Sequence, residues 1–558
     1  MTYLSRRNPI ARPQPAAAAI AVALLGVVFY CFALSVAVMW AQCQLSWWIF
    51  PSAVAAALVT ALVAVPGAVS EGAAVKVTVS TLAVVAAAVG AAWLTIDYSY
   101  DGLYYHQEII AALCSGWDPF APPFDKVPGY TPWAVHYAKA VEIAAASIVS
   151  CTGVLETGKA VNIMALAATA CAVYAWLGEQ GGRLSRHRTL LTLAAVANPV
   201  AWAQLFTYYI DFYKYIYLIF ALMAFSDIAG GRRRGYVVLF MTLILAMATK
   251  FNIFFEAALW VLAAMLWWGI RGDWAALKRV FVTGLLALIA GAALTFHPYI
   301  TNWLQAGHPL YPLMGEGAED IMTSNTPAGY LGRSRFVTFF LSLASVAFPN
   351  VGQPTGGFTP LMPVILLLSL WILIRLRGLI SGAALYTAVL VFASCFLFEQ
   401  AWWARYICQL WAVPAILVGA AFRAGKTMKV SRLTAWLMIA AGGVTFIYAG
   451  KQMLVVGGYQ KIMLEAAAEE PEVVVTGEWW GPQFARQMDE AGVNYRYSAH
   501  MPDTTARAVL YYHEYNDPLV IMSPEGAAKI RSRIERLHLN YNRHIYGSAE
   551  ALEYLSTQ

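Results

Sequence analysis

Long apolar stretches recur through the first 450 residues of this chain, and no other feature constrains its fold as strongly. A helix needs about twenty apolar residues to cross the hydrocarbon core of a bilayer. About thirteen stretches approach that length, and because several are short, a count of twelve or fourteen fits the pattern as well. The stretches are 17–40, 47–69, 74–96, 158–178, 190–207, 214–229, 235–249, 257–270, 280–300, 359–375, 379–398, 406–422 and 433–450. The sequence therefore predicts an all-α polytopic membrane protein.

The composition indicates the same class. Of the 558 residues, 60% are hydrophobic and only 12% are charged, about half the charged share of an ordinary soluble domain. These proportions exclude a soluble enzyme, a disordered chain and a fibrous protein. Seven cysteines in a chain of this length are too few for a disulfide scaffold.

Charged residues are distributed unevenly between the predicted loops. If the N-terminus lies inside, the inner loops carry 19 basic and 4 acidic residues, and the rest of the chain carries 18 basic and 27 acidic residues. The inner side is then +15 and the outer side −9. Because basic residues favour the cytoplasmic side of membrane proteins, the sequence predicts an N-terminus inside and a C-terminus outside.

Three predicted outer segments are too polar to span a membrane: 97–157, 301–358 and the tail from about 451. In the tail, strand-like runs alternate with helical patterns, which is typical of a small α/β domain. The strand-like runs are 473–476, 519–522 and 544–546, and the helical patterns are 481–491, 524–537 and 548–555. We therefore expect a membrane domain over residues 1–450 and an extracytoplasmic α/β domain over residues 451–558.

The first outer segment opens with the sequence Asp97-Tyr-Ser-Tyr-Asp101-Gly-Leu-Tyr-Tyr-His106-Gln-Glu108. If this stretch is helical, Asp97, Asp101 and Glu108 lie within about 40° of one another around the axis. Crowded carboxylates raise the proton affinity of at least one of them. That property suits a general base, or a cation site if two oxygens converge. The alternative is structural: Asp101 caps a helix, and the neighbouring tyrosines form an interfacial belt.

The same segment continues to a helical stretch at 134–149, which we expect to lie along the membrane surface. It also contains Cys114 and Cys151, the two cysteines on the predicted outer side. That compartment permits a disulfide between them, and two free thiols remain the alternative.

An acidic motif at the end of an early span, a long first outer loop, many spans and an outer C-terminal domain resemble the GT-C superfamily. Its members are integral-membrane glycosyltransferases that use lipid-phosphate-linked sugars, and the architecture here is related to that of the protein mannosyltransferase and aminoarabinose transferase families. Asp101-Gly-x-x-x-His-Gln is similar to a motif of bacterial members and stands where eukaryotic relatives show His-Pro-Asp-Glu. The chain departs from that pattern in two places, because Gly102 replaces the second acid and two extra spans precede the loop.

Asp211 and Lys250 fit the active site that this resemblance implies. Asp211 lies in a very short outer turn, where related enzymes carry a second acid, and an ion pair with Lys214 is the alternative. Lys250 lies at the apex between two short spans, where a charge is costly unless an anion neutralises it. A lipid phosphate is one such partner, and Glu256 is the other.

Arg405 and the second outer segment complete the predicted site. The Arg405 guanidinium suits bidentate phosphate binding, and pairing with Glu399 with stacking on neighbouring tryptophans is the alternative. The segment 301–312 looks like the mobile outer loop that closes over the substrate in this superfamily. His297 and His308 suit proton transfer, although lone histidines are more often structural. The residues expected to contact substrate are Tyr105, His106, Glu108, His308, Tyr311, Arg333 and Arg335.

The resemblance and the residues together predict an inverting glycosyltransferase at the outer face of a bacterial inner membrane. Asp101 would deprotonate the acceptor hydroxyl, with Asp97 and Asp211 as the other candidate catalytic acids. Lys250 and Arg405 would hold the phosphate of a polyprenyl-phosphate sugar donor. The acceptor would be a glycan, a lipid or a protein, and no nucleic acid is expected to bind. No cofactor is required, and a divalent cation at the three aspartates is compatible with this chemistry.

Two other classes of membrane protein remain open. A transporter or flippase of lipid-linked saccharides would explain the spans and their charges, but such proteins usually show an internal repeat, which this sequence lacks. A polysaccharide polymerase or ligase also has many spans, but its large outer loop comes late in the chain. Here the motif-rich loop comes early.

Overall fold

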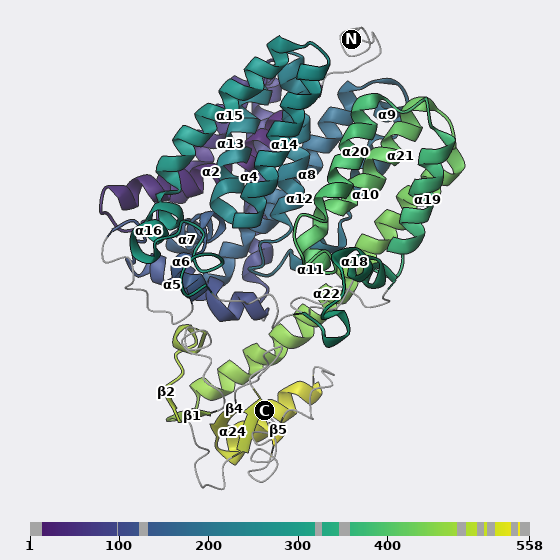
Figure 1. The fold of residues 1–558 in the computed structure, drawn as a ribbon. Helices are drawn as coiled ribbons and strands as arrows, with labels where there is room; N and C mark the ends of the chain where they lie inside the picture. Colours follow the sequence, from purple (N-terminus) through teal and green to yellow (C-terminus); the bar gives the residue numbers. More distant parts are fainter. Residues whose placement is uncertain are drawn as a thin grey trace.

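A computed structural model of the chain describes residues 14–97, 99–121, 132–318, 326–344, 358–476, 487–498, 507–510, 519–536 and 545–546. Helices lie side by side in a bundle, and a small domain with a sheet extends from one end of it (Figure 1). The bundle contains α2 (Pro15–Trp40), α3 (Ile49–Ala64), α4 (Glu71–Trp93), α8 (Ala160–Glu179), α10 (Arg188–Val196), α11 (Pro199–Gln204), α12 (Tyr213–Ala229), α13 (Arg233–Thr249), α14 (Phe251–Ile270), α15 (Trp274–Leu294), α19 (Met362–Arg375), α20 (Gly382–Ser394), α21 (Ala412–Ala424) and α22 (Met428–Ala468).

Shorter helices connect these elements. They are η1 (Gly102–His106), α5 (Gln107–Cys114), α6 (Pro132–His136), α7 (Ala140–Thr152), η2 (Leu155–Lys159), α9 (Gly182–Arg186), α16 (Phe296–Ala306), η3 (Ala328–Tyr330), α18 (Arg335–Ala344) and η4 (Ala404–Trp411). Most of those near residue 100 and residue 300 lie at the end of the bundle that faces the C-terminal domain, whereas α9 lies at the opposite end (Figure 1).

Within the described residues, seven helices are long and apolar enough to cross a membrane. They are Pro15–Trp40, Gly72–Trp93, Leu155–Glu179, Phe251–Ile270, Trp274–Leu294, Ala404–Ala424 and Met428–Ala468. The other predicted spans coincide with shorter helices, and the stretch 190–207 is divided between α10 and α11. The break falls at Asn198, whose side-chain oxygen caps α11 by accepting a hydrogen bond from Val200 N at 3.0 Å. The chain is a helical membrane protein by these features, and the count of thirteen spans stays a prediction.

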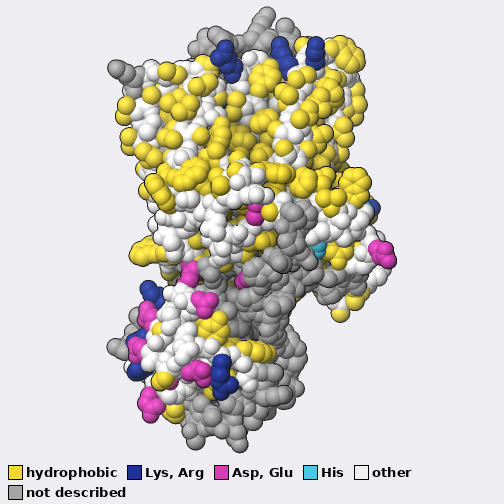
Figure 2. Space-filling view, turned by 90° about the vertical axis from the view of Figure 1, so that its left-hand side faces the viewer, with side chains coloured by type: hydrophobic (Ala, Val, Ile, Leu, Met, Phe, Trp, Pro, Cys, Tyr) yellow, Lys and Arg dark blue, Asp and Glu magenta, His cyan; other side chains and the backbone are white. Residues whose placement is uncertain are grey.

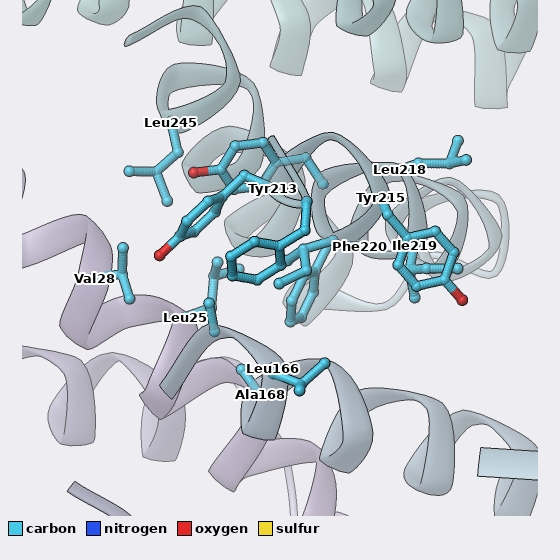
Figure 3. Close-up of a cluster of buried hydrophobic side chains, with 14 of the residues drawn as sticks. Leu25, Val28, Leu166, Ala168, Tyr213, Tyr215, Leu218, Ile219, Phe220 and Leu245 are labelled. Atoms are coloured by element: carbon cyan, nitrogen blue, oxygen red, sulfur yellow. The ribbon is translucent and has the colours of Figure 1, made fainter. Parts of the chain in front are cut away.

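The bundle core is built from small and aromatic side chains that let helices approach closely. Figure 3 shows Leu25 and Val28 of α2 lying close to aromatic and aliphatic side chains of α12 and to residues of α8 and α13. Gly26 of α2 faces Ala57 of α3 so closely that a Cβ on Gly26 would lie 3.1 Å from the Ala57 Cβ. Because lipid tails are as apolar as leucine, such close packing, rather than burial of apolar surface, stabilises helix association in a bilayer.

The surface of the bundle is apolar where a soluble protein is polar. On the face shown in Figure 2, hydrophobic side chains cover the middle of the bundle, and Lys and Arg side chains gather at the end away from the C-terminal domain. On α15, Phe281 is 50% exposed and Ile289 is 62% exposed. Such a surface fits contact with lipid.

The C-terminal domain contains a five-stranded sheet in the order β2-β1-β4-β3-β5, in which β1 and β2 are parallel and the other pairs are antiparallel. The strands are β1 (Val473–Thr476), β2 (Tyr495–Tyr497), β3 (Arg507–Leu510), β4 (Leu519–Met522) and β5 (Ile545–Tyr546), and α24 (Pro524–Arg536) follows β4. The predicted strands at 473–476 and 519–522 are confirmed, whereas β2 and β3 were not predicted. The predicted helix 548–555 and residues 481–486 of the helix 481–491 lie outside the described residues.

Helix α22 carries the chain from the bundle into the C-terminal domain without a break. The predicted boundary at residue 450 therefore falls inside one helix rather than in a linker. Its last turns pack against the sheet domain, with Tyr459, Met463 and Ala467 in the same buried cluster as Val473 of β1.

The first predicted outer segment differs from its expected structure in two respects. The single helix expected at 134–149 is two helices, α6 and α7, and residues Ala140–Val149 of α7 are all buried within the protein rather than lying on its surface. Cys114 and Cys151 are both free thiols, and the Sγ of Cys114 lies 3.5 Å from the carbonyl oxygen of Ala146.

Candidate functional site

Asp97 follows α4 and begins the acidic segment, where it serves as a structural anchor. Its side chain is fully buried, and its two carboxylate oxygens accept hydrogen bonds from Ser99 N and Tyr208 N, each at 2.8 Å. Burial raises the pKa of the Asp97 carboxyl, and the nearby Lys159 acts in the opposite direction. Asp97 therefore ties the start of the segment to the 205–211 turn, and both oxygens are already occupied.

Gly102 is required by the position of Asp97. A Cβ on Gly102 would lie 2.5 Å from the Ser99 Oγ and closer still to the Oδ2 of Asp97. Real Cβ atoms do not approach other heavy atoms so closely, so any side chain would displace the buried carboxylate. This close approach explains why position 102 is a glycine.

The expected face of three carboxylates is not formed. Asp97 lies before the helical region, and residues Gly102–His106 form η1, a π-helix that changes the angular spacing of the side chains. Asp101 has helical backbone angles, with φ at −63° and ψ at −33°, and its side chain makes no capping hydrogen bond. The capping interpretation of Asp101 is therefore wrong.

Asp101 instead begins a chain of ion pairs, which we call the charge network, formed by Asp101, Arg405, Asp211 and Lys250. Asp101 Oδ2 lies 2.7 Å from Arg405 Nη2, and Asp211 Oδ1 lies 2.6 Å from Lys250 Nζ. Arg405 Nε also lies 3.2 Å from Asp211 Oδ2, at an angle too oblique for a hydrogen bond. Gln204 Nε2 donates to that same oxygen at 3.1 Å. Four segments far apart in sequence thus place two cations and two carboxylates together.

Aromatic rings surround the two cations of the charge network. The guanidinium carbon of Arg405 lies 4.6 Å from the ring centroid of Trp403 and 4.8 Å from that of Tyr209. Lys250 Nζ lies 5.0 Å from the ring centroid of Tyr406. The side chains of Asp101, Arg405 and Lys250 are between 11% and 13% exposed. The network is therefore enclosed by aromatic rings, and three of its four side chains are slightly exposed.

Neighbouring charges keep Asp211 and Lys250 of the network charged. Burial alone raises the pKa of Asp211, but Arg405 and Lys250 outweigh that effect and lower it to about 2. Burial likewise lowers the pKa of Lys250, and Asp211 reverses this so that the net shift is upward. Asp211 is therefore a fixed anion at neutral pH, suited to holding the two cations rather than to accepting a proton.

The ion pairs of Lys214 and Lys250 differ from the alternatives that the sequence suggested. Lys214 pairs with Glu256 at 2.8 Å, not with Asp211, and Lys250 pairs with Asp211, not with Glu256. Arg405 stacks on Trp403 as the structural alternative proposed, but it forms ion pairs with Asp101 and Asp211 rather than with Glu399.

A second polar cluster lies beside the network and contains two residues that sequence reasoning missed. His106 Nδ1 lies 2.7 Å from Glu142 Oε1, and Lys139 Nζ lies 2.9 Å from His297 Nε2. Burial lowers the pKa of Lys139 to about 7, with Glu142 acting in the opposite direction. The ring of Tyr105 lies 4.1 Å from that of His106. Charged residues at 139 and 142 beside the apolar run 140–149 were the available signal, because buried ionisable groups often mark function.

The remaining predicted site residues are not members of the charge network. Glu108 is buried in α5, His308 Nδ1 accepts from Leu310 N at 3.1 Å, and the ring of Tyr311 lies 4.7 Å from that of His136. Arg333 is exposed, and Arg335 Nη1 donates to the carbonyl of Phe396 at 2.7 Å.

The structure also bears on a cation site at the three aspartates. In the part of the chain that is described, no group of three or more His, Cys, Asp or Glu side chains is placed so that it could hold a metal ion. Asp97 is engaged with backbone amides and the other two aspartates with cations.

No protein-family profile matches this chain, and no curated protein is significantly similar to it in sequence. The functional argument therefore depends on the geometry of the charge network.

Proposed function

We propose that the protein is an inverting glycosyltransferase that moves a sugar from a polyprenyl-phosphate donor to a hydroxyl acceptor on a glycan, a lipid or a protein. The observation that supports this most is the charge network itself. Asp101 pairs with Arg405, Lys250 joins the same network through Asp211, and the two cations are 12% and 13% exposed. Phosphate departure requires preorganised positive charge where negative charge develops, and acceptor activation requires a positioned base.

In the proposed reaction, Lys250 and Arg405 bind the donor phosphate and Asp211 keeps both cations in place. Asp101 accepts the proton of the acceptor hydroxyl as the new oxygen–carbon bond forms at the anomeric carbon. The bond from that carbon to the phosphate oxygen breaks, and its electron pair leaves with polyprenyl phosphate. The chemistry requires no cofactor.

Donor binding would also activate the base. Asp101 is paired with Arg405 at 2.7 Å, and a carboxylate held by a cation is a weaker base than a free one. The donor phosphate competes for the same guanidinium, because guanidinium binds phosphate bidentately. Asp101 would therefore be a free base only when a donor is present, and it would stay paired with Arg405 in the empty site.

The proposal places the site at the outer face of a bacterial inner membrane, with the N-terminus inside and the C-terminus outside. A tag at Gln558 should then be cleaved by protease added to spheroplasts. The reason is the charge asymmetry of the loops together with the predicted count of thirteen spans, which is odd. Protection of the tag under conditions in which a periplasmic control is cleaved would overturn the orientation.

The function itself is tested with purified protein and a polyprenyl-phosphate sugar that is labelled in the sugar. We expect release of polyprenyl phosphate and transfer of label to added cell-envelope acceptors. The Asp101→Asn variant serves as the matched control. Movement of labelled donor across proteoliposomes without release of polyprenyl phosphate would instead indicate a flippase and would overturn the transferase proposal.

A further inference from the structure

We infer that the C-terminal domain is part of the working site, and that Gln487 is a positioning residue for the segment that carries Asp101. This inference rests on the proposed function for its catalytic consequence, but its geometry stands independently. The sequence indicated a separate outer domain, whereas in the structure that domain contacts Asp97, Tyr100, Tyr104 and Gln107 directly.

Gln487 connects the two ends of the segment that includes Asp101. Its Nε2 lies 3.3 Å from the carbonyl oxygen of Asp97 and 3.3 Å from the Oε1 of Gln107. Gln107 Nε2 donates to the same Asp97 carbonyl at 3.2 Å. Gln487 is only 6% exposed, so these are interior contacts between parts of the chain about 390 residues apart and are not competed for freely by water.

Apolar contacts lie alongside these hydrogen bonds. The rings of Tyr100 and Tyr104 stack with centroids 5.2 Å apart and pack against the buried cluster of the C-terminal domain. Ile96 lies against α22 at Gly457, where a Cβ would be 3.5 Å from the Ile96 Cβ. The residues on both sides of Asp101 therefore contact the C-terminal domain or the helix that leads into it.

The opposite side of the segment is fixed by the bundle. Asp97 binds Tyr208 N, and Gly102 leaves no room for the segment to shift toward Asp97. Asp101 is thus carried by a short stretch held from two directions, with its carboxylate on Arg405. A general base acts only within hydrogen-bond reach of its proton, and a displacement of about 1 Å can cost about a hundredfold in rate.

The test compares Gln487→Ala and Gln487→Glu with Lys529→Ala in the full-length protein. Gln487→Glu keeps the size of the side chain and removes its N–H donors. Lys529 lies in the same domain and forms an exposed ion pair with Glu469. Amide hydrogen exchange over residues 99–107 and the separate values of kcat and KM for the labelled donor are measured.

Both Gln487 variants should exchange faster over residues 99–107, and kcat should fall by about tenfold or more while the donor KM changes less than about twofold. Lys529→Ala should match the parent protein in both measurements. Unchanged hydrogen exchange, or a change in KM with kcat unaltered, would overturn the positioning role of Gln487. If the parent protein transfers no donor, the proposed function fails, and hydrogen exchange still decides whether Gln487 holds the segment.

Discussion

Two charged clusters lie close together in this molecule, and they differ in exposure. The charge network of Asp101, Arg405, Asp211 and Lys250 has three side chains between 11% and 13% exposed. The Lys214–Glu256 pair, which we call the sealed pair, is 1% and 0% exposed. Both contact Tyr406, because Lys214 Nζ donates to its carbonyl at 2.6 Å and Lys250 Nζ lies over its ring.

The difference separates a structural ion pair from a candidate chemical site. The sealed pair lies inside the protein, where Gln409 Nε2 also lies 3.2 Å from Glu256 Oε1. No substrate can reach it without unfolding. The charge network has the same chemical groups, but an anion approaching from outside could exchange with Asp101 on Arg405. Exposure therefore distinguishes the candidate chemical site from the structural ion pair.

The largest effect expected from this comparison is on stability. Glu256→Gln leaves Lys214 without a carboxylate in the interior, and breaking a buried pair in this way costs about 3–5 kcal/mol. Thermal unfolding in detergent should show a lower transition temperature than for the parent protein. The double variant Lys214→Met with Glu256→Leu should recover much of that loss, because replacing both charges by apolar groups is often neutral. A double variant as unstable as the single one would contradict the description of the pair as sealed.

The second largest effect is on catalysis. Asp101→Asn should abolish transfer while leaving donor binding nearly intact. Asn preserves the size of the side chain but removes the basic oxygen, and a positioned general base contributes about 10²–10⁴-fold. We therefore expect transfer of label to fall by at least about a hundredfold.

The other aspartates serve as comparisons for that experiment. Asp97 accepts hydrogen bonds from two backbone amides and Asp211 is fixed by two cations, so neither is placed as the base. An inactive Asp211→Asn or Asp97→Asn together with an active Asp101→Asn would reassign the base. Activity in all three variants would end the proposed mechanism.

Much of the fold follows from apolar length and charge, because these determine where a helix can lie in a bilayer. Every predicted span overlaps helical residues, although 190–207 is divided between α10 and α11. The partners of the charges could not be predicted in the same way. Lys214 is three residues from Asp211 in sequence, yet it binds Glu256 across the bundle. Which cation meets which carboxylate depends on how α12, α14 and η4 pack, and no local pattern encodes that choice.

The site, like the fold, was predicted only in part. Asp101 was identified from the acidic segment, Asp211 and Arg405 from their short outer turns, and Lys250 because a charge between two spans is costly without a partner. The structure brings all four together. Gln487 was missed because an uncharged residue in a polar tail carries no such signal. The π-helix at Gly102–His106 was also missed, so the face expected from α-helical spacing was wrong.

Removing either cation should have a smaller effect than removing the base, and should act on the donor. Lys250→Ala and Arg405→Ala each remove a charged hydrogen-bond donor to phosphate, a loss of about 1.5–3 kcal/mol or about 10- to 150-fold. The measurement is the concentration dependence of polyprenyl-phosphate release. Wild-type rates in both variants would refute the phosphate assignment. The rate of Arg405→Lys should lie between those of the wild type and Arg405→Ala, because lysine keeps the charge but not the bidentate geometry.

The smallest effect is a change in pH dependence that tests whether Asp211 keeps Lys250 protonated. Asp211 raises the pKa of Lys250 against the effect of burial, so Asp211→Asn should lower that pKa. Donor binding that depends on protonated Lys250 is present below this pKa and is lost as pH rises through it. The alkaline limb of kcat/KM should therefore move to lower pH in Asp211→Asn. The acidic limb should not report Asp211, whose own pKa is about 2. Lys250→Arg is the control, because a guanidinium stays protonated and its alkaline limb should disappear. An alkaline limb that is unchanged in both variants would show that Lys250 does not bind the donor as a cation.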